Sequence, residues 1–251
     1  MPAASKKPLN HFLREDCVPA LTARAKYFSI EHVRHFLAEQ KVPASAVSLK
    51  TYLNRMTRER CIHDAGRGWY SSLAEAFTLD PAPVKPLAEE LAARFPLVAF
   101  SCWSTAQVQG AMHHLLGRFV TFVNVEADAM ETVWEHLRDT GRDAWLNPRG
   151  AEAARFAVRE RTVVVRRESR KSLSSEPCAP IEKLLVELCF EARDLRLMAA
   201  ADFHAMLANL AGTRRIPMAL LVSHAAERKL PLGELFGDGN QLIPPFSKRR
   251  R

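Results

Sequence analysis

The chain has 251 residues, 47% of them hydrophobic and 25% charged, an ordinary globular composition that can bury a full core in one or two domains. Its first residues, MPAASKKPLNHFLRED, lack the apolar run of a secretory signal, and no stretch approaches the roughly 18 apolar residues of a membrane-spanning helix. We therefore expect neither a secretory signal nor a transmembrane segment, and we expect a cytoplasmic protein with no membrane partner.

The positive charge is concentrated in two places. Residues 1–72 contain 12 lysines and arginines against 6 acidic residues, residues 73–247 contain 20 against 22, and the last four residues, Lys248 to Arg251, add four positive charges. The formal net charge of +8 therefore comes from the first third of the chain and its end. Such a field favours a polyanionic partner, and nucleic acid is the commonest one in a cytoplasm.

The cysteines give no sign of a disulfide framework or of a zinc site. Five are scattered through the chain, and no pair has the C-x-x-C spacing. We expect reduced thiols, most of them buried.

The first third of the sequence predicts three helices. Residues 8–25 have apolar side chains at helical spacing, and Pro19 is expected to bend or split this helix. The next helix follows Ser29, a good N-cap residue, and ends before Pro43. The third begins near Ser45 or Ser48, with an inward stripe of Leu49, Leu53 and Met56.

The opposite side of this third helix carries residue types that read DNA grooves. Arginine and lysine pair with guanine, asparagine pairs with adenine, and all of them contact phosphates. No carboxylate interrupts this side before Glu59. The candidate DNA-binding residues on it are Lys50, Thr51, Asn54, Arg55 and Arg58.

Two short strand-like runs, 61–65 and 69–73, flank Gly66-Arg67-Gly68, whose glycines permit a tight turn. Three helices followed by a hairpin are typical of a winged helix-turn-helix, with Arg67 at the tip of the wing. We therefore predict a DNA-binding domain over residues 1–77. The alternatives are an ordinary solvated helix face, or a winged helix that serves as a protein-interaction module.

The second part of the chain predicts an α/β domain. Residues 78–86, TLDPAPVKP, form a proline-rich linker, and the domain extends over 87–247. After a short helix at 87–95, strands and helices alternate in a way that indicates right-handed crossovers and a partly parallel sheet. The expected strands are 97–103, 118–126, 142–147 and 161–167, and the expected helices between them are 104–116, 127–141 and 149–158.

Helices follow the last strand. Apolar residues at helical spacing predict three of them, at 181–193, 199–212 and 217–230, as a terminal bundle beside the sheet. The overall fold class is thus α+β or α/β. The basic tail 248–251 is interpreted either as an arm that binds phosphates or as a solvated end.

The alternative from another class of protein is an enzyme. Glu126 and Asp128, at the end of a strand, would hold the metal of a nuclease, but no lysine or third acidic residue has a suitable spacing, and Asp128 is better explained as a charge in the first turn of the next helix. His113 and His114, adjacent on a helix, point about 100° apart. Glycine-rich phosphate loops and catalytic motifs are missing from the sequence. We therefore expect no catalytic residue, metal or cofactor.

Residues 155–171, RFAVRERTVVVRRESRK, form a second basic stretch in a domain that is otherwise acidic. It would extend the DNA-binding surface, bind an acidic protein partner by charge complementarity, or protect an exposed edge strand. Arg166, Arg167 and Arg170 are the candidate residues of this second basic surface.

Several of these segments together resemble a known family. The winged helix ending in GRGWY, the segments FSCWSTAQVQGAMHH and GRFVTFVNVE, and PIEKLLVELCF resemble the AbiEi-type antitoxins of type IV toxin-antitoxin systems and their uncharacterised bacterial relatives. The resemblance covers roughly residues 28 to 230.

The resemblance implies a bacterial transcriptional regulator that binds its own promoter through the winged helix. It also implies that the second domain counteracts a cognate nucleotidyltransferase toxin. By position, DNA reading falls on Lys50, Thr51, Asn54, Arg55 and Arg58, and the wing role on Arg67. The chain departs from the family pattern in its proline-rich linker and its KRRR end, which leaves a stand-alone regulator as an alternative.

Overall fold

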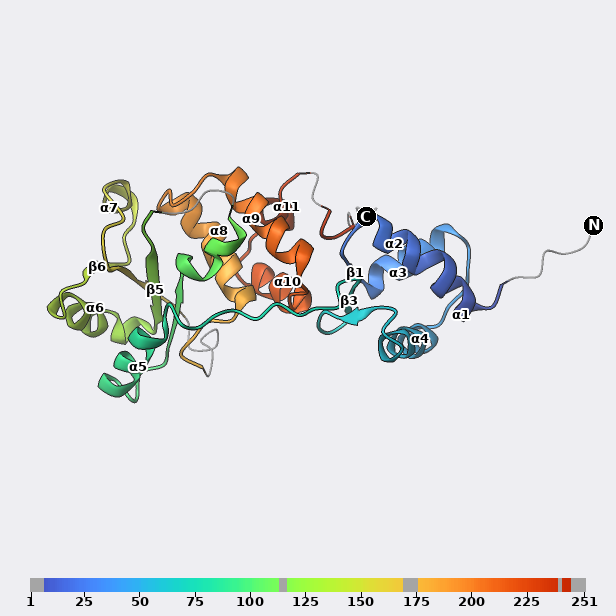
Figure 1. The fold of residues 1–251 in the computed structure, drawn as a ribbon, viewed down its shortest axis with the longest axis horizontal. Coiled ribbons are helices and arrows are strands. Elements are labelled where there is room, and N and C mark those ends of the chain that lie inside the picture. The colour runs from blue at the N-terminus through green and yellow to red at the C-terminus, as the bar shows by residue number, and fades with distance from the viewer. Residues whose placement is uncertain (1–6, 113–116, 169–175, 239–240, 245–251) are drawn as a thin grey trace, which may run out of the picture. The chain divides into compact units, whose positions relative to one another are not determined.

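The fold was analysed in a computed structural model, which describes residues 7–112, 117–168, 176–238 and 241–244 (Figure 1). The structure combines helices with a mixed sheet of parallel and antiparallel strands, in agreement with the predicted fold class. Contacts along the chain define two compact units. The first contains Met1–Phe77 and Ala208–Arg251, and the second contains Thr78–Leu207.

The first unit begins with helices and short strands that alternate. Its N-terminal elements are α1 (Leu9–Phe12), a π-helical turn (Leu13–Cys17), α2 (Val18–Arg24), β1 (Tyr27–Ser29), α3 (Ile30–Glu39), α4 (Ala46–Arg58), β2 (His63–Asp64) and β3 (Trp69–Ser71). The strands are antiparallel and have the order β1-β3-β2. The predicted helix at 8–25 is interrupted where expected, since Pro19 cannot donate a backbone hydrogen bond and the π-helical turn lies directly before α2.

Apolar stripes of the three helical segments share one core. Leu13, Leu21, Val33, Leu37 and Leu53 are all buried in it, together with Phe28 of β1. The predicted N-cap of α3 is confirmed, because Ser29 and His32 form a reciprocal capping box. The predicted inward stripe of α4 is confirmed as well, since Leu49, Leu53 and Met56 are buried.

The C-terminal segment belongs to the first unit, whereas the sequence led us to expect it in the second domain. This segment contains the end of α9 (Ala200–Thr213), α10 (Met218–Glu227) and α11 (Leu232–Phe236). The Tyr27 hydroxyl donates to the carbonyl of Arg214 and accepts from the N–H of Ile216, each at 3.0 Å. The N–H of Tyr27 also donates to the carbonyl of Leu242 at 2.7 Å. Arg214 and Ile216 lie 187 and 189 residues from Tyr27 in sequence, a separation that helical periodicity does not encode.

The turn between β2 and β3 is fixed to this C-terminal segment. Gly66 has a φ of +97°, and a Cβ atom added there would lie 2.7 Å from the Cβ of Ala219 in α10. The carbonyl of Ala65 accepts a hydrogen bond from the N–H of Ala219 at 3.0 Å. Only a glycine at position 66 permits both the left-handed backbone and this close approach.

Replacing Gly66 by alanine is therefore expected to destabilise the protein by about 2–4 kcal/mol, the sum of left-handed strain and overpacking. Gly68→Ala is the matched control, because Gly68 has a φ of +75° but its added Cβ would be 3.8 Å from the nearest side-chain atom. The control should lose about 1–2 kcal/mol. Urea unfolding of both variants measures the difference, and equal losses would contradict the importance of the Ala219 contact.

The second unit is built on a sheet of order β4-β5-β7-β6. Its elements are α5 (Lys85–Arg94), β4 (Phe100–Ser104), a 3₁₀ helix (Thr105–Ala111), β5 (Val120–Val125), a 3₁₀ turn (Ala127–Ala129), α6 (Met130–Asp139), β6 (Asp143–Leu146), α7 (Gly150–Ala154), β7 (Thr162–Arg167), α8 (Ile181–Asp194) and the start of α9. Strand β4 is antiparallel to β5, whereas β5, β7 and β6 are parallel to one another, which confirms the partly parallel sheet. The predicted helix at 104–116 is the 3₁₀ helix over its described part.

Helices cover both faces of this sheet (Figure 1). On one face, Val123 and Val163 pack with Leu91 of α5 and Leu137 of α6. Alternate residues of the strands lie on the other face, which α8 covers, and there the rings of Trp103 and Phe122 stack at 4.0 Å. Because both faces are covered, β7 is apolar at successive positions and does not alternate.

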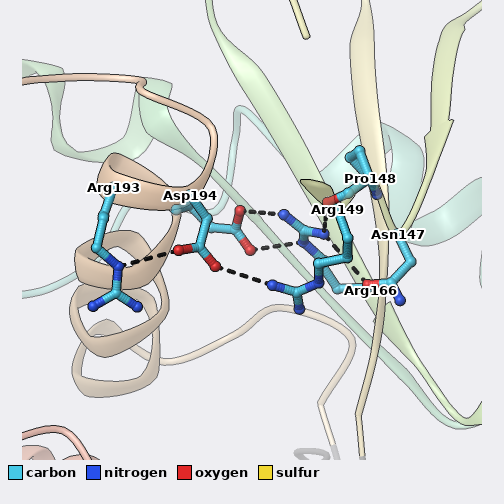
Figure 2. A network of polar contacts seen from close by, with 7 residues as sticks. Asn147, Pro148, Arg149, Arg166, Arg193 and Asp194 are labelled. Carbon is cyan, nitrogen blue, oxygen red and sulfur yellow. Dashed lines mark hydrogen bonds and ion pairs between the residues drawn. The ribbon is translucent and has the colours of Figure 1, made fainter. Parts of the chain in front are cut away.

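The face covered by α8 contains buried ion pairs. Arg166 of β7 forms a bidentate pair with Glu191 of α8, with Nε–Oε1 at 2.7 Å and Nη2–Oε2 at 2.5 Å, and both side chains are 6% exposed. Arg166 also donates to the carbonyl of Pro148 and to the side chain of Asn147 (Figure 2). Close by, Lys183 of α8 pairs with Glu168 at 2.6 Å, again with both side chains buried.

The predicted surface role of Arg166 is therefore wrong. Strand alternation places Thr162, Val164 and Arg166 on the face that α8 covers. Burying a guanidinium is tolerated there because Glu191 and the two other acceptors satisfy its donors. Arg167 is exposed, as predicted, and Arg170 lies outside the described residues.

Candidate nucleic-acid interface

The candidate interface is the outer side of α4. Among the described residues, Lys50, Thr51, Asn54, Arg55 and Arg58 are all exposed, opposite the buried stripe. At 100° per residue, Lys50, Asn54, Arg58 and Thr51 lie within an arc of about 100°. The thirteen residues of α4 include no aspartate or glutamate, so this arc is positively charged.

Val47 lies in the middle of the same arc and was not among the residues predicted from the sequence. Its side chain is 77% exposed. The hydroxyl of Thr51 donates to the carbonyl of Val47 at 3.0 Å, which fixes the Thr51 side chain against its own helix. Isolated apolar residues are so common on polar helix faces that the sequence alone does not distinguish Val47 as a functional residue.

The start of α4 is capped by a serine. The hydroxyl of Ser45 accepts from the N–H of Ser48 at 3.0 Å, and the sequence had placed the start of the helix near Ser45 or Ser48. Ser45 is thus the N-cap. No acidic residue lies in the first turn of α4, so the positive end of the helix dipole adds to the field of the basic arc.

Arg55 lies at the margin of the arc and is partly neutralised. Its Nε is 2.8 Å from Oε1 of Glu59, one turn further along, and Arg14 of the π-helical turn pairs with the other oxygen of the same carboxylate. Glu59 therefore accepts from two arginines. Lys50 and Arg58, for which the described part of the chain offers no carboxylate partner, are the better cations for an external anion.

The hairpin holds Arg67 exposed at the tip of its turn. The N–H of Trp69 donates to the carbonyl of Gly66 at 2.9 Å, and the carbonyl of Gly68 accepts from the N–H of Ile30 at the same distance. The first bond closes the turn itself, and the second ties the turn to the start of α3. The side chain of Arg67 remains accessible for a contact.

The two carboxylates of the nuclease alternative lie directly after β5. Glu126 precedes the 3₁₀ turn and is half-buried, and Asp128 is exposed within that turn. Within the described residues, no group of three histidine, cysteine, aspartate or glutamate side chains is placed to hold a metal ion. His113 and His114 lie outside the described residues, as does the basic tail 248–251.

The remaining predictions on individual residues concern the cysteines. All five are free thiols, with Cys17 and Cys102 buried and Cys61 exposed. Burial raises the pKa of the Cys17 thiol to about 12, so this group stays protonated at neutral pH. None of the helices in the described residues has the length and apolar character needed to cross a membrane.

Comparison with known proteins gives one assignment. The profile of a family described as a family of unknown function (DUF6577) matches residues 48–231, most of the chain. The chain belongs to this family. The DUF6577 match starts within α4 and extends through α10, so it includes the polar residues of the basic arc, the hairpin and the sheet of the second unit. Among curated proteins, none matches the sequence.

Proposed function

We propose that the protein is a DNA-binding transcriptional regulator whose first unit contains a winged helix. The main observation in support is the exposed basic arc of α4, which combines Lys50 and Arg58 with the amide of Asn54 and includes no carboxylate. In this proposal α4 enters the major groove, where lysine and arginine recognise guanine and asparagine recognises adenine. Val47 and the methyl group of Thr51 are suited to contact thymine methyl groups.

The arrangement around α4 supports this proposal. The order helix, strand, helix, helix, strand, strand, with β1 pairing on β3, is the order of elements in a winged helix. In such a domain the hairpin is the wing, and Arg67 is placed to contact a phosphate or the minor groove. A winged helix that binds a protein instead would not need an arc free of acidic residues.

The resemblance to AbiEi-type antitoxins extends the proposal to a biological role. On that basis the protein represses its own operon and counteracts a nucleotidyltransferase toxin encoded beside it. Co-expression with the product of a neighbouring nucleotidyltransferase gene tests this second part. If the product of the neighbouring gene arrests growth and this chain does not relieve the arrest, the antitoxin role is wrong and a stand-alone regulator remains.

A mobility-shift titration with the DNA upstream of the protein's own reading frame tests DNA binding, with a shuffled duplex of equal composition as the control. We expect a shift of the upstream duplex at protein concentrations at least tenfold lower than those needed for the shuffled duplex. Equal affinity for both duplexes would contradict a specific regulator. Binding of neither would contradict the proposal as a whole.

Arg67→Ala is expected to weaken binding to all duplexes to a similar extent, because a wing arginine on a phosphate carries no sequence information. Loss of one phosphate contact reduces the slope of log K against log salt concentration by about 0.9. Fluorescence anisotropy titrations between 50 and about 200 mM salt measure this slope. An unchanged slope would show that Arg67 does not contact the DNA backbone.

A further inference from the structure

A cavity of about 560 Å³ lies in the second unit, at the edge of the sheet where the parallel strands begin. The residues around it come just before or at the start of β5, β6 and β7, from the end of the antiparallel β4, and from the beginning of α5. This volume is within the range of about 300–1,000 Å³ found for small-molecule sites. The cavity lies wholly within Thr78–Leu207 and uses no residue of the basic arc.

Arginines converge on this cavity from separate segments. Within the described residues, its lining includes Arg118, Arg142, Arg159 and Arg161, with Glu160 as the accompanying carboxylate. Like charges repel one another, and Glu160 together with Glu90, the partner of Arg142, balances only two of these four positive charges. An anion in the cavity would offset the remaining repulsion.

Two of these arginines are held in place, and two are available. The guanidinium of Arg142 pairs with Glu90, with Nη1–Oε1 at 3.0 Å, and Arg118 donates to the carbonyl of Val158 at 3.2 Å. Arg159 and Arg161 are exposed, and no hydrogen bond or ion pair engages their side chains in the described part of the chain. Their donors are therefore free for a ligand.

The turn that carries the two available arginines is well fixed. Arg161 has a φ of 57°, a left-handed conformation that is unfavourable for a residue other than glycine, asparagine or aspartate. The N–H of Arg159 donates to the hydroxyl of Thr162 at 2.7 Å, and this hydroxyl donates in turn to Asp143 at 2.8 Å. The turn thus presents both side chains at the cavity with little backbone freedom.

Part of the cavity lining is apolar. Pro83, Pro86 and Leu87 of the α5 segment contribute to it together with Phe119, which is half-buried. An inorganic ion would leave this apolar part empty. A ligand that fills the cavity combines an anionic group with an apolar or planar part.

We propose that this cavity binds a small phosphate ester of mononucleotide size. Arg118, Arg159 and Arg161 bind the phosphate, since guanidinium groups form paired hydrogen bonds with phosphate oxygens. The planar part lies against Phe119 and Leu87. The ligand is a free small molecule, because a volume of about 560 Å³ accommodates one phosphate group and one planar group.

Calorimetric titration of the full chain with AMP, GMP, CMP and UMP tests the proposal, with the matching nucleosides and inorganic phosphate as control probes. We expect at least one mononucleotide to bind at least tenfold more tightly than its nucleoside and than inorganic phosphate. No heat from any mononucleotide at millimolar concentration would overturn the proposal. Equal binding of inorganic phosphate and the mononucleotides would also overturn it, because it would indicate a simple anion site.

The double variant Arg159→Gln/Arg161→Asn removes the available guanidinium groups, and asparagine tolerates the left-handed backbone at position 161. We expect it to weaken mononucleotide binding at least tenfold while its melting temperature stays unchanged. The matched control, Arg94→Gln/Arg138→Gln, removes two exposed charges of the same unit that do not line the cavity, and should bind normally. Normal binding by the double variant would overturn the assignment.

Two titrations with nucleic acid distinguish a phosphate of a free small molecule from a phosphate of a nucleic-acid strand. If a short oligonucleotide competes with the bound mononucleotide and its own affinity falls in the double variant, the phosphate belongs to a nucleic-acid strand and the small-molecule proposal is wrong. If the double variant shifts its upstream DNA normally, the cavity acts apart from α4. Failure of DNA binding in the wild-type protein would leave the calorimetric result unaffected.

Discussion

The combined variant Lys50→Ala/Asn54→Ala/Arg58→Ala is expected to bind the upstream DNA more than about 100-fold more weakly than the wild-type protein. Each true base or phosphate contact contributes about 1–3 kcal/mol, and every 1.4 kcal/mol is a factor of ten in affinity. All three side chains are exposed and lie on the arc of α4. Fluorescence anisotropy at fixed salt concentration measures the loss.

The folded structure should survive these changes, because alanine is the best helix former and exposed substitutions usually alter stability by less than about 0.5 kcal/mol. Thermal unfolding monitored by circular dichroism checks this. The matched control is Arg94→Ala/Arg138→Ala, which also removes two exposed positive charges, here from the second unit. Wild-type affinity in the triple variant would show that α4 is not the reading helix.

Arg55 is left unchanged in this design because it already pairs with Glu59. Its removal would free a carboxylate beside Arg14 and the basic arc, so a loss of binding would have two explanations. The structure thus gives a cleaner set of substitutions than the helical pattern alone.

The second large effect concerns stability. Arg166→Leu is expected to lower the free energy of unfolding by about 3–5 kcal/mol, because it leaves Glu191 buried and without its cationic partner. Urea unfolding at pH 7 measures this loss. Arg149→Ala is the matched control, since Arg149 pairs with Asp194 at 3.0 Å while its side chain is 59% exposed (Figure 2), and exposed pairs contribute at most about 1 kcal/mol.

The double variant Arg166→Leu/Glu191→Leu should recover most of the lost stability, because neither side chain then leaves a buried charge. If it is as unstable as Arg166→Leu alone, packing of the arginine stem and not the uncompensated carboxylate accounts for the effect. If Arg166→Leu is as stable as the wild-type protein, the pair is not buried in solution.

The loss in Arg166→Leu is expected to depend on pH. Burial raises the pKa of Glu191, and the hydrogen bonds and charge of Arg166 oppose this rise. Without Arg166 the pKa rises further. When the pKa of a carboxyl group is higher in the folded state than in the unfolded state, the protein loses stability as pH increases from the unfolded pKa towards the folded pKa. The difference between the variant and the wild-type protein should therefore shrink as pH falls towards about 4.3, the ordinary pKa of glutamate.

Local patterns were sufficient where one side of an element is buried and the other is solvated. The inward stripe of α4 and the N-cap at Ser29 were predicted and are present. They follow from residues three or four positions apart, which a helix brings together by itself. The strands of the second unit were found in the same way, as short apolar runs separated by helices.

The same patterns misplaced Arg166. In RTVVVRR, successive apolar residues show that both faces of the strand are covered. They do not show whether the arginines at the end of the strand are covered as well. Whether Arg166 is exposed depends on α8, because its partner Glu191 lies 25 residues further along the chain. Strand β1, with three residues, is too short to give a signal, and its pairing with β3 depends on contacts across about 40 residues.

The sequence by itself determined where most of the helices and the strands of the second unit lie, which side of α4 is polar, and that the positive charge is concentrated in the first third and at the end of the chain. The tertiary structure alone decided that residues 208–251 complete the first unit, that Arg166 is buried, and that Arg159 and Arg161 line a cavity. The physical reason is the range of the interactions. Periodicity and capping act within a few residues, whereas the burial of a charge or the closing of a cavity requires partners that only the folded chain brings together.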